Sequence, residues 1–329
     1  MTWVPFNEPD SAWDQLVTGL GVVSPYQLSS WSRFREAHGW RPIRFIATSR
    51  VAAVQFLTKR PVRALRIAWS PGGPAGLTDS AASLLELSRA IGEYMGGWPQ
   101  YIRLSDSRLE SNAHASDYHK SGWRTCSTRL SAIQTLLLAI PSDAHELVNG
   151  YSSNWSRNLR RGEQRGIVSE VWEDPNPKEL ADLYRDVVNL KVGVQTDWRT
   201  RANDVARFLL CCGSQLLVTR ARDQRGNTLA YRGAVRVGER AFDVLAASSV
   251  AGRKTYASHV ATHRLLTELS ATGCKQLDFG GIDPSSNKGV FDFKHGTGSV
   301  KHSYVGEFHI GKPKLLEDLV GKLISSRTT

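Results

Sequence analysis

Apolar residues recur in the first half of the chain at spacings that predict both helices and strands. Helical spacing appears in residues 29–39 and again in residues 80–94. Strand-like runs lie at residues 43–60, which hold two strands, and at residues 65–69 and 99–104. An apolar run at residues 128–141 closes this half. The first half of the chain is therefore predicted to contain both helices and strands.

The second half shows a clearer succession of elements. Its predicted helices lie within residues 152–173, 177–190, 203–212 and 255–272. Residues 215–248 predict three antiparallel strands, with turns at Arg225-Gly226-Asn227 and at Gly238-Glu239. Strands are also expected at residues 275–280 and 290–293. Helices, an antiparallel meander, a helix and further strands predict an α+β protein with two domains and mixed sheets.

The composition predicts a soluble, cytoplasmic protein that is large enough for two domains. The 329 residues suffice for two domains, and a hydrophobic content of 41% supports real cores. No run of eighteen apolar residues occurs, and the first residues lack the pattern of a signal peptide. Four cysteines give neither a disulfide framework nor a metal pattern. We expect a cytoplasmic chain, without stable membrane insertion and monomeric.

The charge of the chain is strongly positive, with a formal net charge of +11. Arginine outnumbers lysine, and its planar guanidinium suits phosphate and carboxylate groups. The predicted helix within residues 152–173 gathers basic residues near one side: Arg157, Arg160, Arg161 and Arg165. Two interpretations stay open, a solvated basic surface and a surface for a polyanion such as nucleic acid.

Residues 277–298, LDFGGIDPSSNKGVFDFKHGTG, place a lysine after two aromatic residues and between glycine-rich loops. They do not form a phosphate loop, because Lys288 precedes Gly289 and no helix is expected to follow. His259 and His263 have a spacing that suits a metal, but no Glu completes a metal motif, so we expect a structural role and no metal. The alternation around Lys294 alone indicates a strand with a solvent-facing lysine.

The order of elements in the second half resembles the acetyltransferase fold of the GNAT superfamily. That fold binds the pyrophosphate of CoA with a glycine-rich loop at the start of a helix. The matching segment here, AGRKTYASHV, has Tyr256 where a glycine is expected. A side chain there obstructs the approach of a pyrophosphate to the backbone. The resemblance therefore implies this fold without CoA, and we expect no cofactor.

Four segments, in order, resemble the FemABX aminoacyltransferases, which carry the GNAT fold twice and do not use CoA. These segments are QLSSWSRFREAHGW, IAWSPGGPAG, YSSNWSRNLRRGEQRGIVSEV and GCKQLDFGGID…GVFDFKHGTG. The resemblance covers nearly the whole chain and lacks the coiled-coil arm of some members. It implies two tandem GNAT-like domains with mixed, mainly antiparallel sheets. We expect residues 1–150 plus 309–329 to form the acceptor side, and residues 151–308 to form the aminoacyl-tRNA side.

The family's activity implies transfer of a small amino acid, such as alanine, serine or glycine, from aminoacyl-tRNA to an amine of a peptide acceptor. The acceptor is a peptidoglycan precursor or a peptide natural product such as a peptidyl nucleoside antibiotic, and it can be nucleotide-linked. By resemblance Lys294 is catalytic, and the basic helix binds tRNA. The resemblance gives five residues to substrate binding: Trp31, Arg35, Arg199, Tyr256 and Phe293.

The base that takes the proton from the attacking amine is not apparent in the sequence. Asp106, Asp278 and Asp283 are candidates, of which Asp278 fits better as a backbone cap, and substrate-assisted transfer is equally credible. Trp69 and Gly72 stand where the family usually has tyrosine and arginine, so the acceptor can differ from the usual one. The alternative functions are a CoA-dependent N-acyltransferase and a non-catalytic nucleic-acid-binding protein.

Overall fold

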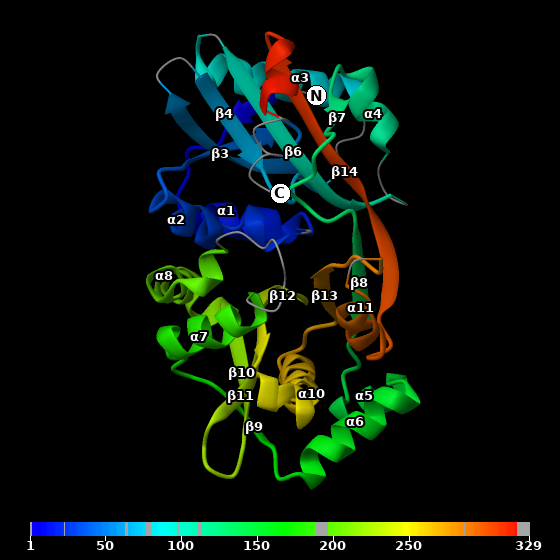
Figure 1. The fold of residues 1–329 in the computed structure, drawn as a ribbon. Helices are drawn as coiled ribbons and strands as arrows, with labels where there is room; N and C mark the ends of the chain where they lie inside the picture. The colour runs from blue at the N-terminus through cyan, green and yellow to red at the C-terminus, as the bar shows by residue number, and fades with distance from the viewer. Residues whose placement is uncertain are drawn as a thin grey trace. The chain divides into compact units, whose positions relative to one another are not determined.

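A computed structural model describes residues 2–22, 24–62, 65–76, 80–97, 99–110, 114–188, 197–285 and 287–320. The chain divides into two compact units, coloured in sequence order in Figure 1. Unit 1 contains Met1–Ile133 and Ser303–Thr329, and unit 2 contains Gln134–His302. Within the described ranges, no helix combines the length and the apolar character needed to cross a bilayer.

Unit 1 is built on a mixed sheet in the order β1-β2-β3-β4-β6-β14. The strands are β1 (Trp3–Pro5), β2 (Arg41–Ala47), β3 (Ala52–Val62), β4 (Leu65–Ser70), β6 (Gln100–Leu109) and β14 (Val300–Lys312). Two short strands, β5 (Ala75–Gly76) and β7 (Arg124–Thr125), pair with β3 and β14. Among the described strand pairs of this unit, only β4 and β6 run parallel, and the other pairs are antiparallel. The last strand comes from the far end of the sequence and completes the sheet of unit 1.

Helices cover both faces of this sheet (Figure 1). They are α1 (Asp10–Gly19), α2 (Ser29–Glu36), α3 (Ala81–Met95) and α4 (Ala115–Lys120). Leu84, Leu87 and Ile91 of α3 join the apolar cluster that contains Phe56 of β3. Gln55, the neighbour of Phe56, points to the opposite face, where its amide bonds to the carbonyl of Leu28 just before α2.

Unit 2 is built on a sheet in the order β8-β13-β12-β11-β10-β9. The strands are β8 (Gln134–Ala139), β9 (Val168–Val171), β10 (Leu216–Arg222), β11 (Thr228–Val237), β12 (Arg240–Ser248) and β13 (Gln276–Gly281). The predicted meander at residues 215–248 corresponds to β10, β11 and β12. Its strands pair antiparallel, whereas β12 and β13 run parallel because α10 connects them on one face.

The helices of unit 2 pack on both faces of its sheet. They are α5 (Leu147–Gly150), α6 (Ser153–Gln164), α7 (Pro177–Val188), α8 (Ala202–Cys212), α9 (Val250–Lys254), α10 (Ala257–Ala271) and α11 (Lys288–His295), with the short 3-10 helix η3 (Trp198–Thr200). Thr219 of β10 donates to the carbonyl of Ala261 in α10 at 2.9 Å. On the opposite face, Tyr231 of β11 donates to the carbonyl of Leu180 in α7 at 3.0 Å. Side chains that alternate along the strands therefore bond to the helices on opposite faces of the sheet.

The expectation of a strand at residues 290–293 is wrong, because these residues lie inside α11. The alternation of Phe291 and Phe293 has a period of two, but the helix is held by local bonds that such a short pattern does not reveal. The amide of Phe291 donates to the carbonyl of Asn287 at 3.1 Å. Lys288 pairs with Asp292 one turn later at 2.6 Å, which stabilises the exposed side of the helix.

The two units also divide the chain at different residues from those expected. The first boundary lies at residues 133 and 134 instead of 150 and 151, because β8 pairs with β13 of unit 2. The second lies at residues 302 and 303, because β14 pairs with β6 of unit 1 from Tyr304 onward. Pairing between strands distant in sequence sets both boundaries. The acceptor and tRNA sides assigned to the units stay predictions.

A buried ion pair fastens β14 to β6 and provides a test of this architecture. Arg103 Nε donates to Glu307 Oε1 at 2.7 Å, and Glu307 Oε2 accepts from the amide of Leu130 at 2.8 Å. We expect Glu307→Gln to lower the free energy of unfolding by about 3 kcal/mol, because Arg103 stays buried without its counter-charge. Urea unfolding followed by tryptophan fluorescence measures the change. The control is Glu86→Gln, which breaks an exposed pair with Arg89 and should change stability by less than about 1 kcal/mol. Equal effects of the two substitutions would contradict the role given to Glu307.

Candidate functional site

The parallel strands β12 and β13 of unit 2 separate after a short stretch of pairing. Their register runs from Arg240 opposite Gln276 to Phe242 opposite Asp278 and, in the described part of the chain, goes no further. A β-bulge begins at this point, where β12 shifts its register against Gly233 and Ala234 of β11. A bulge bends a strand and redirects its side chains. The parted strand ends and the residues beside them form the candidate site.

A buried ion pair lies at the bulge. Arg232 of β11 donates from Nη1 to Asp243 Oδ2 at 2.7 Å and from Nε to Thr262 Oγ1 of α10 at 3.1 Å. The side chains of Arg232 and Asp243 are only 8% and 5% exposed. Asp243 Oδ1 is buried and has no hydrogen-bond partner among the described residues. Buried carboxylate oxygens normally have a partner, so Oδ1 has capacity to accept a further hydrogen bond.

Lys294 lies beside this pair and is buried, contrary to the expectation of a solvent-facing lysine from its local pattern. Its Nζ donates to the carbonyl of Phe279 at 2.5 Å and to that of Gly281 at 3.4 Å, both at the end of β13. Burial lowers the pKa of Lys294 below its ordinary value; Arg232 acts in the same direction, while Asp243 opposes it. An ammonium has three donors, so one N–H remains beyond these two carbonyls.

Aromatic rings enclose Phe293, the neighbour of Lys294. The Phe293 ring lies 4.9 Å from that of His259 and 6.1 Å from that of Trp155, and Arg232 Cζ lies 5.0 Å from its centroid. Trp155 Nε1 donates to the Phe293 carbonyl at 3.1 Å. Burial, followed by the charge of Arg232, lowers the pKa of His259 to about 4. The imidazole is therefore neutral at pH 7, and it packs against Phe293 together with the Trp155 indole.

Tyr256 stands at the start of α10 in the left-handed conformation, with φ of 63°. Glycine adopts this conformation most readily. The backbone at Tyr256 therefore has the conformation that suits a glycine, which is the residue expected at this position of the fold. Two basic residues at the end of α6 cover the Tyr256 ring: Arg161 of the helix, with Cζ 6.0 Å from the ring centroid, and Arg165 just after it, with Cζ at 4.9 Å. Arg165 also donates to the carbonyl of Lys254. Tyrosine and two guanidiniums thus occupy the space beside this helix start.

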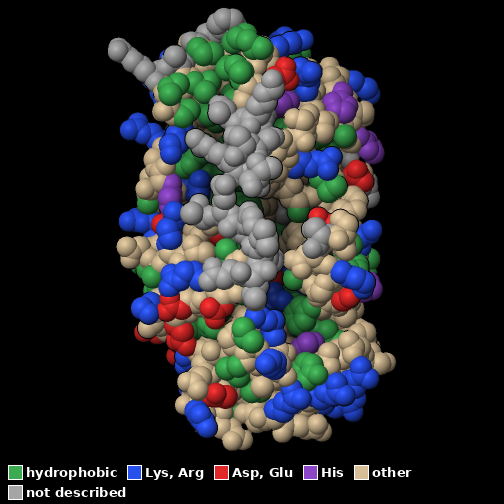
Figure 2. All heavy atoms as spheres, in the orientation of Figure 1, with side chains coloured by type: hydrophobic (Ala, Val, Ile, Leu, Met, Phe, Trp, Pro, Cys, Tyr) green, Lys and Arg blue, Asp and Glu red, His purple; other side chains and the backbone are tan. Residues whose placement is uncertain are grey.

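The four arginines predicted on the basic helix are all exposed. Arg157 and Arg160 lie on α6 with Arg161, and Arg165 follows the helix directly. Figure 2 shows Lys and Arg side chains gathered over the part of unit 2 that contains α6. The apolar side of the helix, with Trp155 and Leu159, is buried in the core of unit 2. The helix therefore presents a one-sided basic surface.

Arg199 is held close to the bulge by its own neighbours. It forms a two-pronged pair with Asp197, stacks on the Tyr184 ring with Cζ at 4.6 Å, and donates to the carbonyl of Val244 at 3.5 Å. Arg199 contributes to the electrostatic field at Lys294, whose pKa it helps to lower. The structure therefore brings Arg199, Phe293 and Lys294, three of the predicted site residues, to one part of unit 2.

In unit 1, Arg35 lies within a group of three indole rings. Its Cζ is 5.6 Å from the ring of Trp31, 5.8 Å from that of Trp40 and 5.9 Å from that of Trp69. The indole N–H groups of Trp31 and Trp69 are buried and have no hydrogen-bond partner among the described residues. A guanidinium with indole donors beside it suits an anionic oxygen. Trp69, the departure noted in the sequence, is part of this group.

The carboxylate of Asp106 is occupied, which argues against its role as a base. It accepts from Arg108 Nη2 at 2.6 Å, from the Arg108 amide at 2.9 Å and from Tyr118 OH at 2.9 Å. Asp278 is occupied as well, by Thr135 Oγ1 at 2.5 Å and the Gly280 amide at 2.7 Å. The expectation that Asp278 binds local backbone agrees with this geometry. Both carboxylates stabilise the fold around them.

Sequence reasoning missed Arg232 and Asp243. Both stand inside strands whose other inward residues are small or apolar, as in AYRGAVRV and FDVLAAS. A charged residue within such a strand is a signal of a buried pair, but the sequence does not show which partner it meets. The bulge on β12 brings Asp243 next to Arg232, and no residue pattern predicted the bulge.

Three comparisons with known proteins bear on the fold. No family model matches the chain, and no curated protein matches it. A solved structure described as FemX is similar over 97% of this chain and 100% of its own, with 14% identity and a TM-score of 0.79. L-PGS from Bacillus licheniformis is similar over 96% of this chain and 97% of its own, with 14% identity and a TM-score of 0.55.

A tandem GNAT protein from the clavulanic acid biosynthesis pathway is also similar, over 94% of this chain and 98% of its own, with 8% identity and a TM-score of 0.56. These likenesses span both units. They confirm the predicted α+β fold of two tandem GNAT-like domains and its likeness to FemX. At such identities they establish the fold and leave the chemistry to the residues of this chain.

Proposed function

We propose that this protein is an aminoacyltransferase that moves an amino acid from aminoacyl-tRNA to an amine of a peptide acceptor. The observation that carries the proposal is Tyr256 at the start of α10, with Arg161 and Arg165 over its ring. Acyl transfer from CoA on this fold needs an open cradle for pyrophosphate at a helix start. In this chain the start of α10 lacks such a cradle and lies next to a basic surface that suits the phosphates of RNA.

The reaction needs orientation and charge stabilisation more than activation. The amine nitrogen attacks the carbonyl carbon of the ester, an oxyanion develops, and the bond to the ribose oxygen of tRNA breaks. The nitrogen loses a proton, and a proton takes the place of the aminoacyl group on that ribose oxygen. Fixing both substrates supplies several kcal/mol of the barrier, and one preorganised donor at the oxyanion supplies about 3 kcal/mol.

Lys294 is the proposed donor to the oxyanion. Two of its N–H groups are fixed by the carbonyls of Phe279 and Gly281, so the ammonium is already oriented before substrate binds. Burial strengthens the interaction of a cation with a developing negative charge. Phe293 beside it forms an apolar wall of the same site.

Asp243 is the proposed acceptor for the α-ammonium of the transferred amino acid. Arg232 donates to its Oδ2, while Oδ1 keeps capacity for a further donor. An ammonium group is the natural partner of a buried carboxylate oxygen near the reacting ester. This assignment distinguishes the transferred group from an acyl chain without nitrogen.

Arg35 and Arg199 are proposed to bind the acceptor, each within its own unit. Arg35 with the indole donors around it suits a phosphate or carboxylate. Arg199 is oriented by Asp197 and Tyr184, which leaves its position well defined. The acceptor is a peptide that carries such an anionic group, and a nucleotide-linked peptide is one example. Transfer of a small residue such as alanine, serine or glycine is consistent with the buried surroundings of Lys294.

The proposal is tested with labelled aminoacyl-tRNA and a panel of peptide amines. Label should leave tRNA only when an acceptor amine is present. In the same assay, Arg157→Ala with Arg161→Ala should weaken tRNA use and lower the salt slope by about 0.7 to 0.9 per lost phosphate contact. The matched control, Arg207→Ala with Arg225→Ala, removes two exposed arginines of unit 2 outside α6. Turnover of acetyl-CoA without tRNA, or RNA binding without transfer to any amine, would replace this function by one of the two alternatives.

Lys294→Met should lower kcat roughly a hundredfold with a smaller change in KM, because only the charged donor is removed. Circular dichroism and tRNA binding establish whether the variant is folded. Lys288→Met, on the exposed side of the same helix, is the matched control and should leave kcat near that of the original protein. A folded Lys294→Met variant with unchanged kcat would reduce Lys294 to a structural donor for β13.

Asp243→Asn should reduce the preference of the enzyme for an ammonium on the transferred group. Its test compares aminoacyl-tRNA with tRNA charged with the corresponding α-hydroxy acid, in which a hydroxyl replaces the ammonium. The original protein should favour the amino acid by about tenfold or more in kcat/KM, and the variant should bring the ratio near one. Asp292→Asn, an exposed carboxylate on α11, should keep the original ratio. A ratio that survives Asp243→Asn would refute the assignment.

A further inference from the structure

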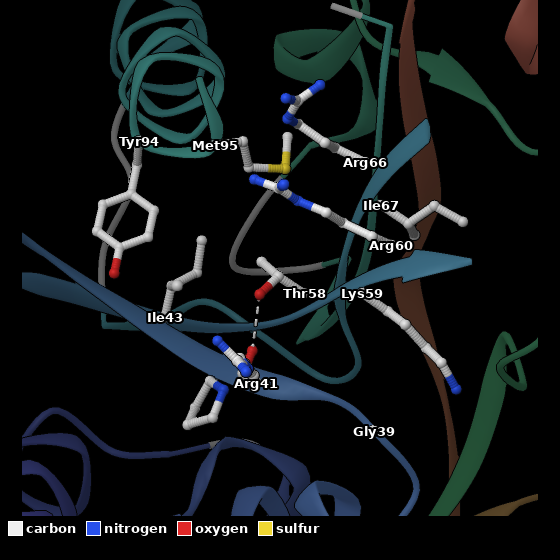
Figure 3. A pocket seen from close by; sticks show the side chains of 11 residues that line it. Gly39, Arg41, Ile43, Thr58, Lys59, Arg60, Arg66, Ile67, Tyr94 and Met95 are labelled. Atoms are coloured by element: carbon white, nitrogen blue, oxygen red, sulfur yellow. Dashed lines mark hydrogen bonds between the residues drawn. The ribbon is translucent and has the colours of Figure 1, made fainter. Parts of the chain in front are cut away.

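A pocket of about 650 Å³ lies in unit 1, beside the C-terminal end of α3 (Figure 3). Three strands line it with Arg41 of β2, Arg60 of β3 and Arg66 of β4, and α3 adds Tyr94 and Met95. Volumes of this order are typical of small-molecule sites. None of the residues assigned above to the transfer reaction lines it.

The lining of this pocket has an excess of positive charge. Four of the eleven lining residues are Lys or Arg, and none is acidic. Arg41, Arg60 and Arg66 have no side-chain hydrogen bond or ion pair within the described residues, and Arg66 Nε is buried without a partner. Guanidiniums left unpaired around a cavity favour an anion with several oxygens, for which phosphate is the usual partner.

The pocket and the Arg35 group lie on opposite faces of the sheet of unit 1. Residues opposite each other in paired strands share a face, and Thr58 is opposite both Arg41 and Ala68. Ala68 belongs to the core beneath α3, so these residues face α3. The alternation along β4 places Trp69, which contacts Arg35, on the other face. The pocket arginines therefore lie on the face opposite to Arg35, whereas Lys59 Nζ lies 5.6 Å from the centroid of the Trp40 ring, on the Arg35 side.

Apolar side chains complete the pocket. Ile43 and Met95 are buried, whereas the residue Tyr94 is 54% exposed. Figure 3 shows Tyr94 and Ile43 on one side of the space and the guanidiniums of Arg60 and Arg66 on another. This arrangement fits a ligand with a charged end and an apolar or flat end.

We propose that this pocket binds a phosphate monoester joined to an aromatic or apolar group, of about the size of a mononucleotide. The phosphate lies among Arg41, Arg60 and Arg66, and the apolar part contacts Tyr94, Ile43 and Met95. Such a ligand can be free in solution or can be the headgroup of a lipid. The proposal concerns binding alone and does not depend on the transfer reaction.

Isothermal titration calorimetry of the full chain tests the proposal with defined probes. The soluble probes are AMP and phenyl phosphate, with adenosine and inorganic phosphate as their separate parts. The lipid probe is a phosphatidylcholine vesicle with or without phosphatidic acid. We expect a joined ligand to bind at least about tenfold more tightly than either part, because both ends of the pocket contribute.

Arg60→Gln and Arg66→Gln should each weaken this binding by about tenfold, since each removes a charged donor to the phosphate. The matched control is Arg89→Gln, on the exposed side of α3 and outside the pocket, which should not change it. Binding of AMP or phenyl phosphate that falls in the pocket variants supports a soluble ligand, and vesicle binding that falls in them supports a lipid. Absence of binding to every probe, or binding that the pocket variants leave unchanged, would overturn the proposal.

Discussion

The buried ion pair of Arg232 with Asp243 is the interaction on which the candidate site depends. A charge inside a protein is costly unless a counter-charge and hydrogen bonds compensate it. Thr262 and Asp243 satisfy Arg232, and the bulge on β12 is what brings Asp243 to that position. The neighbouring ammonium of Lys294 adds a second buried cation, which the carbonyls at the end of β13 satisfy.

These constraints explain why the site forms where β12 and β13 separate. Paired strands use their backbone groups on each other, whereas parted ends leave carbonyls for a side chain such as Lys294. The helices then fix the rest. Trp155 from α6 and His259 from α10 pack against Phe293 and so position the residue before Lys294. Preorganisation of this kind is what an acyl transfer needs from its catalyst.

Three clusters of positive charge in this chain have different surroundings. Arginines of α6 form an exposed surface, Arg35 lies among indole rings, and the pocket beside α3 has unpaired guanidiniums. An exposed helix surface suits a long polyanion such as RNA, whereas guanidiniums gathered around a cavity suit a compact anion. Net charge alone could not distinguish these partners. Their separation gives each a different experimental signature.

Several features follow from the sequence by itself. Periodicity identified the meander of β10, β11 and β12 and the long helices, because those segments are long enough to show their period. The basic side of α6 and the tyrosine at a position where glycine is expected could also be predicted from the sequence, because each depends on residues adjacent in sequence.

The tertiary structure decided the other features. Residues 290–293 are helical through local bonds that a four-residue alternation cannot reveal, and the unit boundaries follow from pairing of β8 and β14 with distant strands. Arg232, Asp243 and Lys294 meet only through a bulge and a parting of strands, because burial of a charge is determined by partners that lie far along the chain.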